Sequence, residues 1–124
     1  MSKKSKPFIF SKCVITRVID GDTFVADVDL GFGVWVRKQK FRLYGVDTPE
    51  TRGKRKTKKG ILVKNYVKDL LEGKTFEIKC FGKGKYGRWL ADVKLSGERL
   101  LSHHLVSMEY AKSMIYGFIN RISG

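Results

Sequence analysis

The chain has 124 residues, which is enough for one domain with a single core and too short for two ordinary domains. Hydrophobic residues make up 42% of it and aromatic residues 12%, so its composition excludes an intrinsically disordered chain. Lys and Arg number 26 against 12 Asp and Glu, and the formal net charge of +14 indicates a polyanionic partner. Because the sequence contains no apolar run of membrane-spanning length, we expect nucleic acid rather than a membrane.

The first half of the chain predicts three strands. The β-branched run at 13–19 predicts a strand that ends in the turn "DGD". A third strand is expected at 34–46, after the turn "GFG". In the intervening strand at 23–30, an alternation of period two predicts four side chains that face the core: Phe24, Ala26, Val28 and Leu30.

A basic segment and a helix come next. The segment "RGKRKTKK" at 52–59 carries six basic residues in eight positions, which predicts an exposed loop. Gly73 is placed to end the helix that follows this loop. The helix itself is indicated by apolar residues at helical spacing: Val63, Val67 and Leu70 or Leu71.

Two more strands and a short helix complete the expected fold. The runs "TFEIKCF" at 75–81 and "WLADVKL" at 89–95 are typical of strands, and Ser102 is placed to cap the second helix. One helix therefore lies between the third and fourth strands and one follows the fifth. This order predicts an α+β, mainly β fold, a small and partly open five-stranded barrel of the OB type.

The beginning of the chain and its two cysteines bear on the compartment. The start "MSKKSKPFIF" is basic but has too short an apolar stretch for a secretory signal, so we expect a cytoplasmic protein. Cys13 and Cys80 lack the spacing of metal ligands. In a cytoplasmic chain such a pair is more often two free thiols than a disulfide.

Four of the acidic residues lie in two short windows, "DGDT" and "DTPE": Asp20, Asp22, Asp47 and Glu50. Carboxylates that gather in a basic chain suggest a hard divalent cation, which prefers oxygen ligands. The alternative is that "DGD" is only a turn, since Asp and Gly are favoured there for local reasons. Pro49 fixes the backbone between Thr48 and Glu50, a rigidity that a solvent-exposed turn does not need.

Two arginines flank these acids in the expected fold. Arg42 lies on the strand that leads to "DTPE", and Arg88 precedes the fifth strand. A guanidinium group has paired planar donors that match two phosphate oxygens. Each arginine alone could be a surface residue, but beside a metal site in a basic chain the pair is typical of a phosphate clamp.

The motifs "VIDGDT", "FRLYGVDTPET", "KYGR" and a later "LV", in this order, resemble those of the staphylococcal nuclease (thermonuclease) family. The resemblance covers about 13 to 112, and it implies an OB-fold barrel that hydrolyses phosphodiester bonds in DNA and RNA with calcium. It divides the chain into a basic N-terminal arm at 1–11, a staphylococcal-nuclease-like OB domain at 12–116 and a short C-terminal tail at 117–124. One departure is Glu109, which stands where the family usually has glycine after the "LV" pair.

The resemblance also implies roles for the acidic residues. Asp22 and Asp47 match the carboxylate ligands of calcium, and Thr48 matches the residue that contributes a backbone carbonyl. Asp20 matches an acid beside the metal that acts through water. Glu50 matches the carboxylate that holds or deprotonates the attacking water.

The same resemblance implies the groups that bind substrate. Arg42 and Arg88 match the arginines that grip the scissile phosphate, and Lys85 and Tyr86 match groups that contact a flanking phosphate. The basic segment comes directly after Glu50, and this position favours an arm that follows a polynucleotide. The segment therefore adds three candidates for substrate binding: Lys54, Arg55 and Lys56.

Three functional classes remain open on the sequence alone. A nuclease is favoured, because catalytically silent OB modules that resemble this family typically lack some of the acids or an arginine, and all are present here. A silent nucleic-acid-binding module is the alternative. A basic protein that coats nucleic acid would explain the charge of +14 but not the clustered acids.

Overall fold

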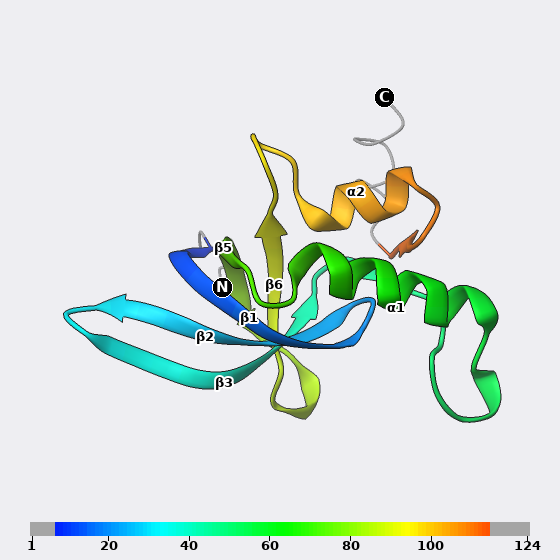
Figure 1. The fold of residues 1–124 in the computed structure, drawn as a ribbon, viewed down its shortest axis with the longest axis horizontal. Coiled ribbons are helices and arrows are strands. Elements are labelled where there is room, and N and C mark those ends of the chain that lie inside the picture. Colours follow the sequence, from blue (N-terminus) through cyan, green and yellow to red (C-terminus); the bar gives the residue numbers. More distant parts are fainter. Residues whose placement is uncertain (1–6, 115–124) are drawn as a thin grey trace.

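A computed structural model describes residues 7–114, and these fold into a small β-barrel with two helices on its outside (Figure 1). The barrel is closed, with the strand order β1-β2-β3-β6-β5. Its strands are β1 (Phe8–Asp20), β2 (Thr23–Gly31), β3 (Val34–Leu43), β5 (Thr75–Lys83) and β6 (Trp89–Lys94). The other elements are two short strands, β4 (Val46–Asp47) and β7 (Lys112–Ser113), two 3₁₀ turns, η1 (Gly53–Arg55) and η2 (Lys85–Gly87), and the helices α1 (Lys58–Leu71) and α2 (Leu101–Ser107).

The predicted α+β, mainly β OB fold is confirmed, with α1 between the third and fourth barrel strands and α2 after the fifth. Where the sequence predicted a partly open barrel, a short parallel pairing closes it. In that pairing Phe41–Leu43 of β3 lies beside Trp89–Ala91 of β6, whereas all other barrel pairings are antiparallel. This closure brings Arg42 next to the beginning of β6, just after Arg88 in the chain.

The core forms where the strand alternation and the helix face meet. Phe24 and Phe41 stack inside the barrel with ring centroids 5.4 Å apart. Helix α1 packs along β1 and buries Val63 and Val67, as the helical spacing predicted. Each such side chain stabilises the fold by about 1.5–3 kcal/mol relative to an exposed position. The helix ends at Leu71, and Gly73 follows in a left-handed conformation with φ of 81°, which favours glycine.

Helix α2 begins differently from the prediction. Leu100 is its N-cap residue, and Ser102 lies buried inside the helix rather than at its end. The hydroxyl of Ser102 donates to the buried carboxylate of Asp92 on β6, which also accepts the backbone N–H of Ser102 at 3.1 Å. The Asp92 carboxylate, on a neighbouring strand, therefore accepts one of the backbone N–H groups that the first helical turn leaves free. A hydroxyl side chain at the N-cap is not needed for this group. Burial raises the pKa of this Asp92 carboxyl.

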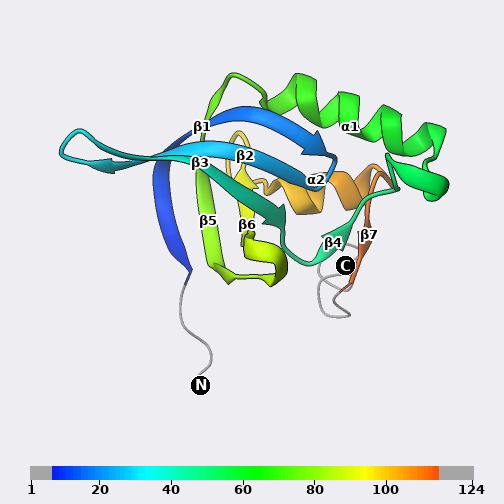
Figure 2. The same ribbon diagram turned by 90° about the horizontal axis from the view of Figure 1, so that it is seen from below.

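Two further expectations are corrected at the barrel ends. Leu30 is half-exposed rather than buried, because the hairpin of β2 and β3 extends beyond the barrel and leaves nothing to cover its tip (Figures 1 and 2). Strand β1 begins at Phe8, so residues 8–11 belong to the barrel and not to the arm expected at 1–11. The remainder of that arm, 1–6, and the tail expected at 117–124 lie outside the described residues.

The two cysteines are free thiols, as predicted, and both are buried. Burial raises the pKa of Cys13 to about 11, so its thiol is protonated at neutral pH. Neither helix of the described part, 7–114, is long and apolar enough to cross a membrane.

Candidate functional site

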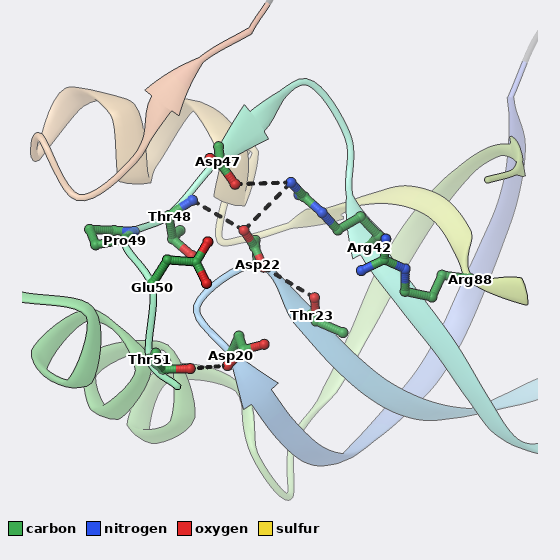
Figure 3. A pocket seen from close by; sticks show the side chains of 10 residues that line it. All are labelled: Asp20, Asp22, Thr23, Arg42, Asp47, Thr48, Pro49, Glu50, Thr51 and Arg88. Carbon is green, nitrogen blue, oxygen red and sulfur yellow. Dashed lines mark hydrogen bonds and ion pairs between the residues drawn. The ribbon is translucent and has the colours of Figure 1, made fainter. Parts of the chain in front are cut away.

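One rim of the barrel holds a polar pocket of about 200 Å³ (Figure 3). Strand β1 ends there at Asp20, β3 brings Arg42, and β4 leads into the segment that carries Thr48 and Glu50. The pocket brings together seven of the predicted site residues, Asp20, Asp22, Arg42, Asp47, Thr48, Glu50 and Arg88, with three others, Thr23, Pro49 and Thr51. Four carboxylates and two guanidinium groups therefore share one small cavity in a strongly basic chain.

Asp22 is buried and held from several sides. Its Oδ2 accepts the backbone N–H of Thr48 at 3.1 Å, and its Oδ1 accepts the hydroxyl of Thr23 at 3.1 Å. Gly21 lies so close to α1 and to Thr48 that an added Cβ would come within 2.8 Å of Val63 and 3.1 Å of the Thr48 side chain. The "DGD" segment is thus packed against its surroundings, and its glycine is needed for close approach as well as for a turn.

Arg42 is the link between the two windows of acids. Its Nη1 donates to the backbone carbonyls of Leu43 at 2.7 Å and Val46 at 2.9 Å. Its Nη2 lies 3.3 Å from a carboxylate oxygen of Asp47 and 3.6 Å from one of Asp22 (Figure 3). The side chain is only 15% exposed, so this guanidinium is rigidly placed and partly neutralises both acids.

Glu50 and Asp20 lie on the other side of the pocket. The Glu50 side chain is exposed, but its backbone carbonyl accepts the N–H of Thr57 at 3.0 Å and the Thr57 hydroxyl at 3.3 Å. Asp20 accepts a hydrogen bond from the Thr51 hydroxyl and lies 3.3 Å from the guanidinium of Arg52. The start of α1 therefore fixes the backbone of Glu50, while the carboxylate itself is free to face the pocket.

Arg88 approaches from the loop between β5 and β6 and lines a second pocket of about 580 Å³ as well. Its guanidinium carbon lies 5.5 Å from the ring centroid of Tyr86. Its Nε is buried and makes no hydrogen bond within the described part of the chain. A buried donor without an acceptor is costly to the fold.

The family model of staphylococcal nuclease homologues matches residues 40–121, about two thirds of the chain. The chain belongs to the staphylococcal nuclease homologue family. The match includes Arg42, Asp47, Glu50 and Arg88, and it confirms the resemblance inferred from the motifs. No curated protein matches the chain significantly. Membership supports a nuclease-like or nucleic-acid-binding domain.

Some predicted residues of this nuclease homologue lie away from the pocket. Lys85 lines the second pocket with Arg42 and Arg88, but Tyr86 is 87% exposed and lines neither cavity. Lys54 and Lys56 are exposed on the segment before α1 and also line neither cavity. The side chain of Arg55, the third candidate of that segment, lies outside the described part.

Several residues that shape the site of this nuclease homologue were not predicted from the sequence. Thr23 and Thr51 each donate a hydroxyl to one of the acids, and both lie inside the quoted motifs, so their position next to Asp22 and Glu50 was an available signal. Thr57 and Gly60 at the start of α1 support the Glu50 backbone. No local pattern could have identified these two, because their role depends on how α1 docks.

The donor set of this pocket fits a hard cation with few protein ligands. Asp22 and Asp47 contact the same nitrogen of Arg42, so their carboxylates are neighbours, and Thr48 lines the same cavity. Within 7–114 no group of three or more His, Cys, Asp or Glu lies close enough to hold a metal ion. Two carboxylates and a backbone carbonyl would therefore require water for the remaining positions, which calcium accepts more readily than an ion that demands a tight octahedron.

Proposed function

We propose that this domain is a calcium-dependent nuclease that hydrolyses phosphodiester bonds of DNA or RNA. The observation that carries the proposal is the convergence of four carboxylates and two guanidinium groups in one pocket of a chain with a net charge of +14. The basic surface would attract a polyanion, and a cation held by the acids of the pocket would offset their repulsion of a phosphate.

The two arginines would act on the phosphate. Attack by water develops negative charge on the non-bridging oxygens, and preorganised donors stabilise that charge more than they stabilise the substrate. Two backbone carbonyls accept from the Nη1 of Arg42 and fix its guanidinium group at the pocket. Arg88 would act beside it, because it lines the same pocket.

Glu50 is the proposed general base. Its carboxylate faces the pocket while its backbone is anchored to Thr57, so it can accept a proton from water without losing its position. Asp20, held by Thr51 and Arg52, would orient solvent beside it.

Calcium would be held by Asp22, Asp47 and the carbonyl of Thr48, with Asp20 acting through water. When bound, it would supply positive charge next to the phosphate and orient water in the pocket. Beyond the pocket, Lys85 and Tyr86 would contact a neighbouring phosphate. The basic segment would strengthen attraction to the polyanion through Lys54, Arg55 and Lys56.

A second candidate is a nucleic-acid-binding module without catalysis. It is favoured by the contacts of Arg42, whose Nη1 and Nη2 both have protein acceptors and would have to exchange one of them for a phosphate oxygen. The two candidates share the basic surface and differ in whether bonds are cut.

The test incubates the purified chain with single-stranded DNA, duplex DNA and RNA, in calcium and in EGTA. Cleavage in calcium that stops in EGTA is the expected result. Binding without cleavage under all conditions would support the second candidate, the nucleic-acid-binding module without catalysis. Full cleavage in EGTA would contradict the calcium requirement. The variant Glu50→Gln, which retains shape and loses the base, should bind and not cut, and this excludes a contaminating nuclease.

A further inference from the structure

Phe81 is a large apolar side chain that the fold leaves at the surface. Between Cys80 and Gly82, strand β5 carries one residue more than its partner β6, since Cys80 pairs with Ala91 and Gly82 with Leu90. Phe81 is that extra residue, and Gly82 next to it has φ of 134°, which favours glycine. Such bulges redirect a side chain, and here the ring remains 41% exposed.

The bulge directs Phe81 toward a second exposed aromatic ring. Tyr44 lies in the turn between β3 and β4, and its ring centroid is 4.8 Å from that of Phe81. The backbone N–H of Tyr44 donates to the carbonyl of Ala91 at 2.8 Å, so the ring is mounted on the barrel. Because Tyr44 is itself 39% exposed, the two rings form a fixed aromatic surface open to solvent, which we call the Tyr44–Phe81 platform.

The platform lies between two cavities. Tyr44 lines the pocket of about 580 Å³ that also contains Arg42 and Arg88. Phe81 lines an apolar groove of about 530 Å³ at the barrel end, together with Phe8 and Trp89. The platform therefore connects the candidate active site to an apolar surface that the proposed chemistry does not use.

The charges along this route are positive. The ammonium of Lys83 lies 4.3 Å from the ring centroid of Trp89. Lys83 lines the pocket of about 580 Å³ and Trp89 lines the apolar groove, so this contact connects the two cavities. The pocket of about 580 Å³ is lined by four basic residues and no acidic one: Lys83, Lys85, Arg42 and Arg88. The apolar groove is lined by uncharged residues. Cations interleaved with aromatic faces match a partner whose negative charges alternate with flat rings.

We propose that the Tyr44–Phe81 platform and the adjoining Trp89 bind unpaired bases of a single-stranded nucleic acid whose backbone continues from the Arg42 and Arg88 pocket. This deepens the proposed function, on which it rests, by naming the substrate class. A paired base hides both faces in the duplex stack, so only an unpaired base can lie on these rings. Phosphates between successive bases would meet Lys83 and Lys85.

The test measures binding in EGTA, where cleavage does not interfere. Labelled oligothymidines of about 4 and about 12 nucleotides, within the length that one OB fold covers, are titrated with the full chain beside a duplex of the longer length. The wild type should bind the longer strand more tightly than the duplex. Phe81→Ala and Tyr44→Ala should each weaken binding of the longer strand by about 5-fold to 100-fold, while Phe81→Trp, which retains a stacking face, should keep it.

The matched control is Phe32→Ala, which removes an equally apolar ring from the tip of the β2–β3 hairpin, where Phe32 is fully exposed and lines neither cavity. Its affinity should equal that of the wild type. Thermal melts of each variant identify loss of folding, and the two platform variants give independent measurements. If both bind the longer strand as Phe32→Ala does, or if they weaken the duplex equally, the platform is not a single-strand site. Loss of affinity in the two platform variants supports the single-strand site whether or not the wild type cleaves nucleic acid. A failure of the nuclease proposal would therefore be a separate result.

Discussion

Gly60 of α1 lies against the backbone of Glu50, the proposed base. A Cβ added at Gly60 would stand 2.7 Å from the carbonyl carbon of Glu50 and 2.9 Å from the carbonyl oxygen of Pro49. The Gly60 N–H donates to the hydroxyl of Thr57 at 2.8 Å, and that hydroxyl in turn donates to the Glu50 carbonyl. The first turn of α1 therefore determines where the loop with the base can lie.

Gly60→Ala should displace this loop and lower cleavage. Real Cβ atoms do not approach backbone so closely, and relief of such overpacking costs about 1–3 kcal/mol. We expect cleavage to fall by more than about 10-fold, because small displacements of a positioned group have large effects on rate. Single-turnover cleavage measures the loss of rate, and urea unfolding measures the loss of stability. Leu62→Ala, at an exposed position of the same helix, is the control, and equal activity of the two variants would contradict the coupling.

Arg88→Lys should separate the clamp from simple attraction. Lysine keeps the charge but loses the paired planar donors, so cleavage should fall by about 100-fold to 1000-fold. Nucleic-acid binding should change by less than about 10-fold, and the thermal melt should stay cooperative. Arg42→Lys should lose as much activity and also some stability, since Arg42 holds two backbone carbonyls. Arg37→Lys, on the exposed hairpin, is the control, and lysine variants that cut at its rate would exclude the clamp.

Calcium should raise the melting temperature of the chain in the absence of substrate. A ligand that binds only the folded state stabilises it by about 2.7 kcal/mol at one hundred times its dissociation constant. Asp22→Asn and Asp47→Asn should each reduce this shift, because each removes a proposed ligand charge. Asp27→Asn, away from the pocket, should not. A shift that persists in both pocket variants would place the ion elsewhere.

Protonation of His104 should destabilise the fold. Its Nδ1 lies 3.1 Å from the guanidinium of Arg99, which can only donate, so this nitrogen must accept and the ring must be neutral; Nε2 then donates to the hydroxyl of Tyr66 at 2.6 Å. Burial, followed by the charge of Arg99, lowers the pKa of His104. The unfolded state therefore binds the proton first, and the stability from this neutral ring is present above about pH 6.5 and lost as pH falls through the folded pKa.

The measurement is urea unfolding of the wild type and of His104→Gln across this pH range. The difference between the two should diminish as pH falls, because only the wild type has the ring to protonate. Asp92, whose pKa burial raises, affects stability in the opposite direction but is present in both proteins. A constant difference would show that His104 does not titrate in the fold.

Glu109→Gly should stabilise the chain. Glu109 follows α2 with φ of 63°, a left-handed conformation in which a side chain costs about 1 kcal/mol and glycine does not. Because glycine also gains freedom in the unfolded state, we expect a net increase of about 0.5 kcal/mol in the free energy of unfolding. Urea unfolding measures it. Glu98→Gly, exposed and without positive φ, should not stabilise, and equal effects would remove the conformational explanation.

Most of the fold and the identity of the acids could be predicted from the sequence, because both depend on local patterns. Alternation of period two gave the barrel strands, helical spacing gave the buried face of α1, and the windows "DGDT" and "DTPE" gave the four carboxylates that share the pocket. Gly73 ends α1 for a reason that is also local, since its φ is positive.

Tertiary structure alone decided what those residues contact. The parallel pairing of β3 with β6 places Arg42 beside Arg88, and the fold of the β3–β4 turn lets Arg42 hold Asp22 and Asp47 together. The Ser102 hydroxyl donates to Asp92 instead of capping the helix, and the Tyr44 ring contacts Phe81, the bulged residue of β5. Apart from Arg42 and Asp47, which are five residues apart, the partners in each pair are at least ten residues apart in the sequence. Their contact depends on strand register and packing, which no short stretch of sequence encodes.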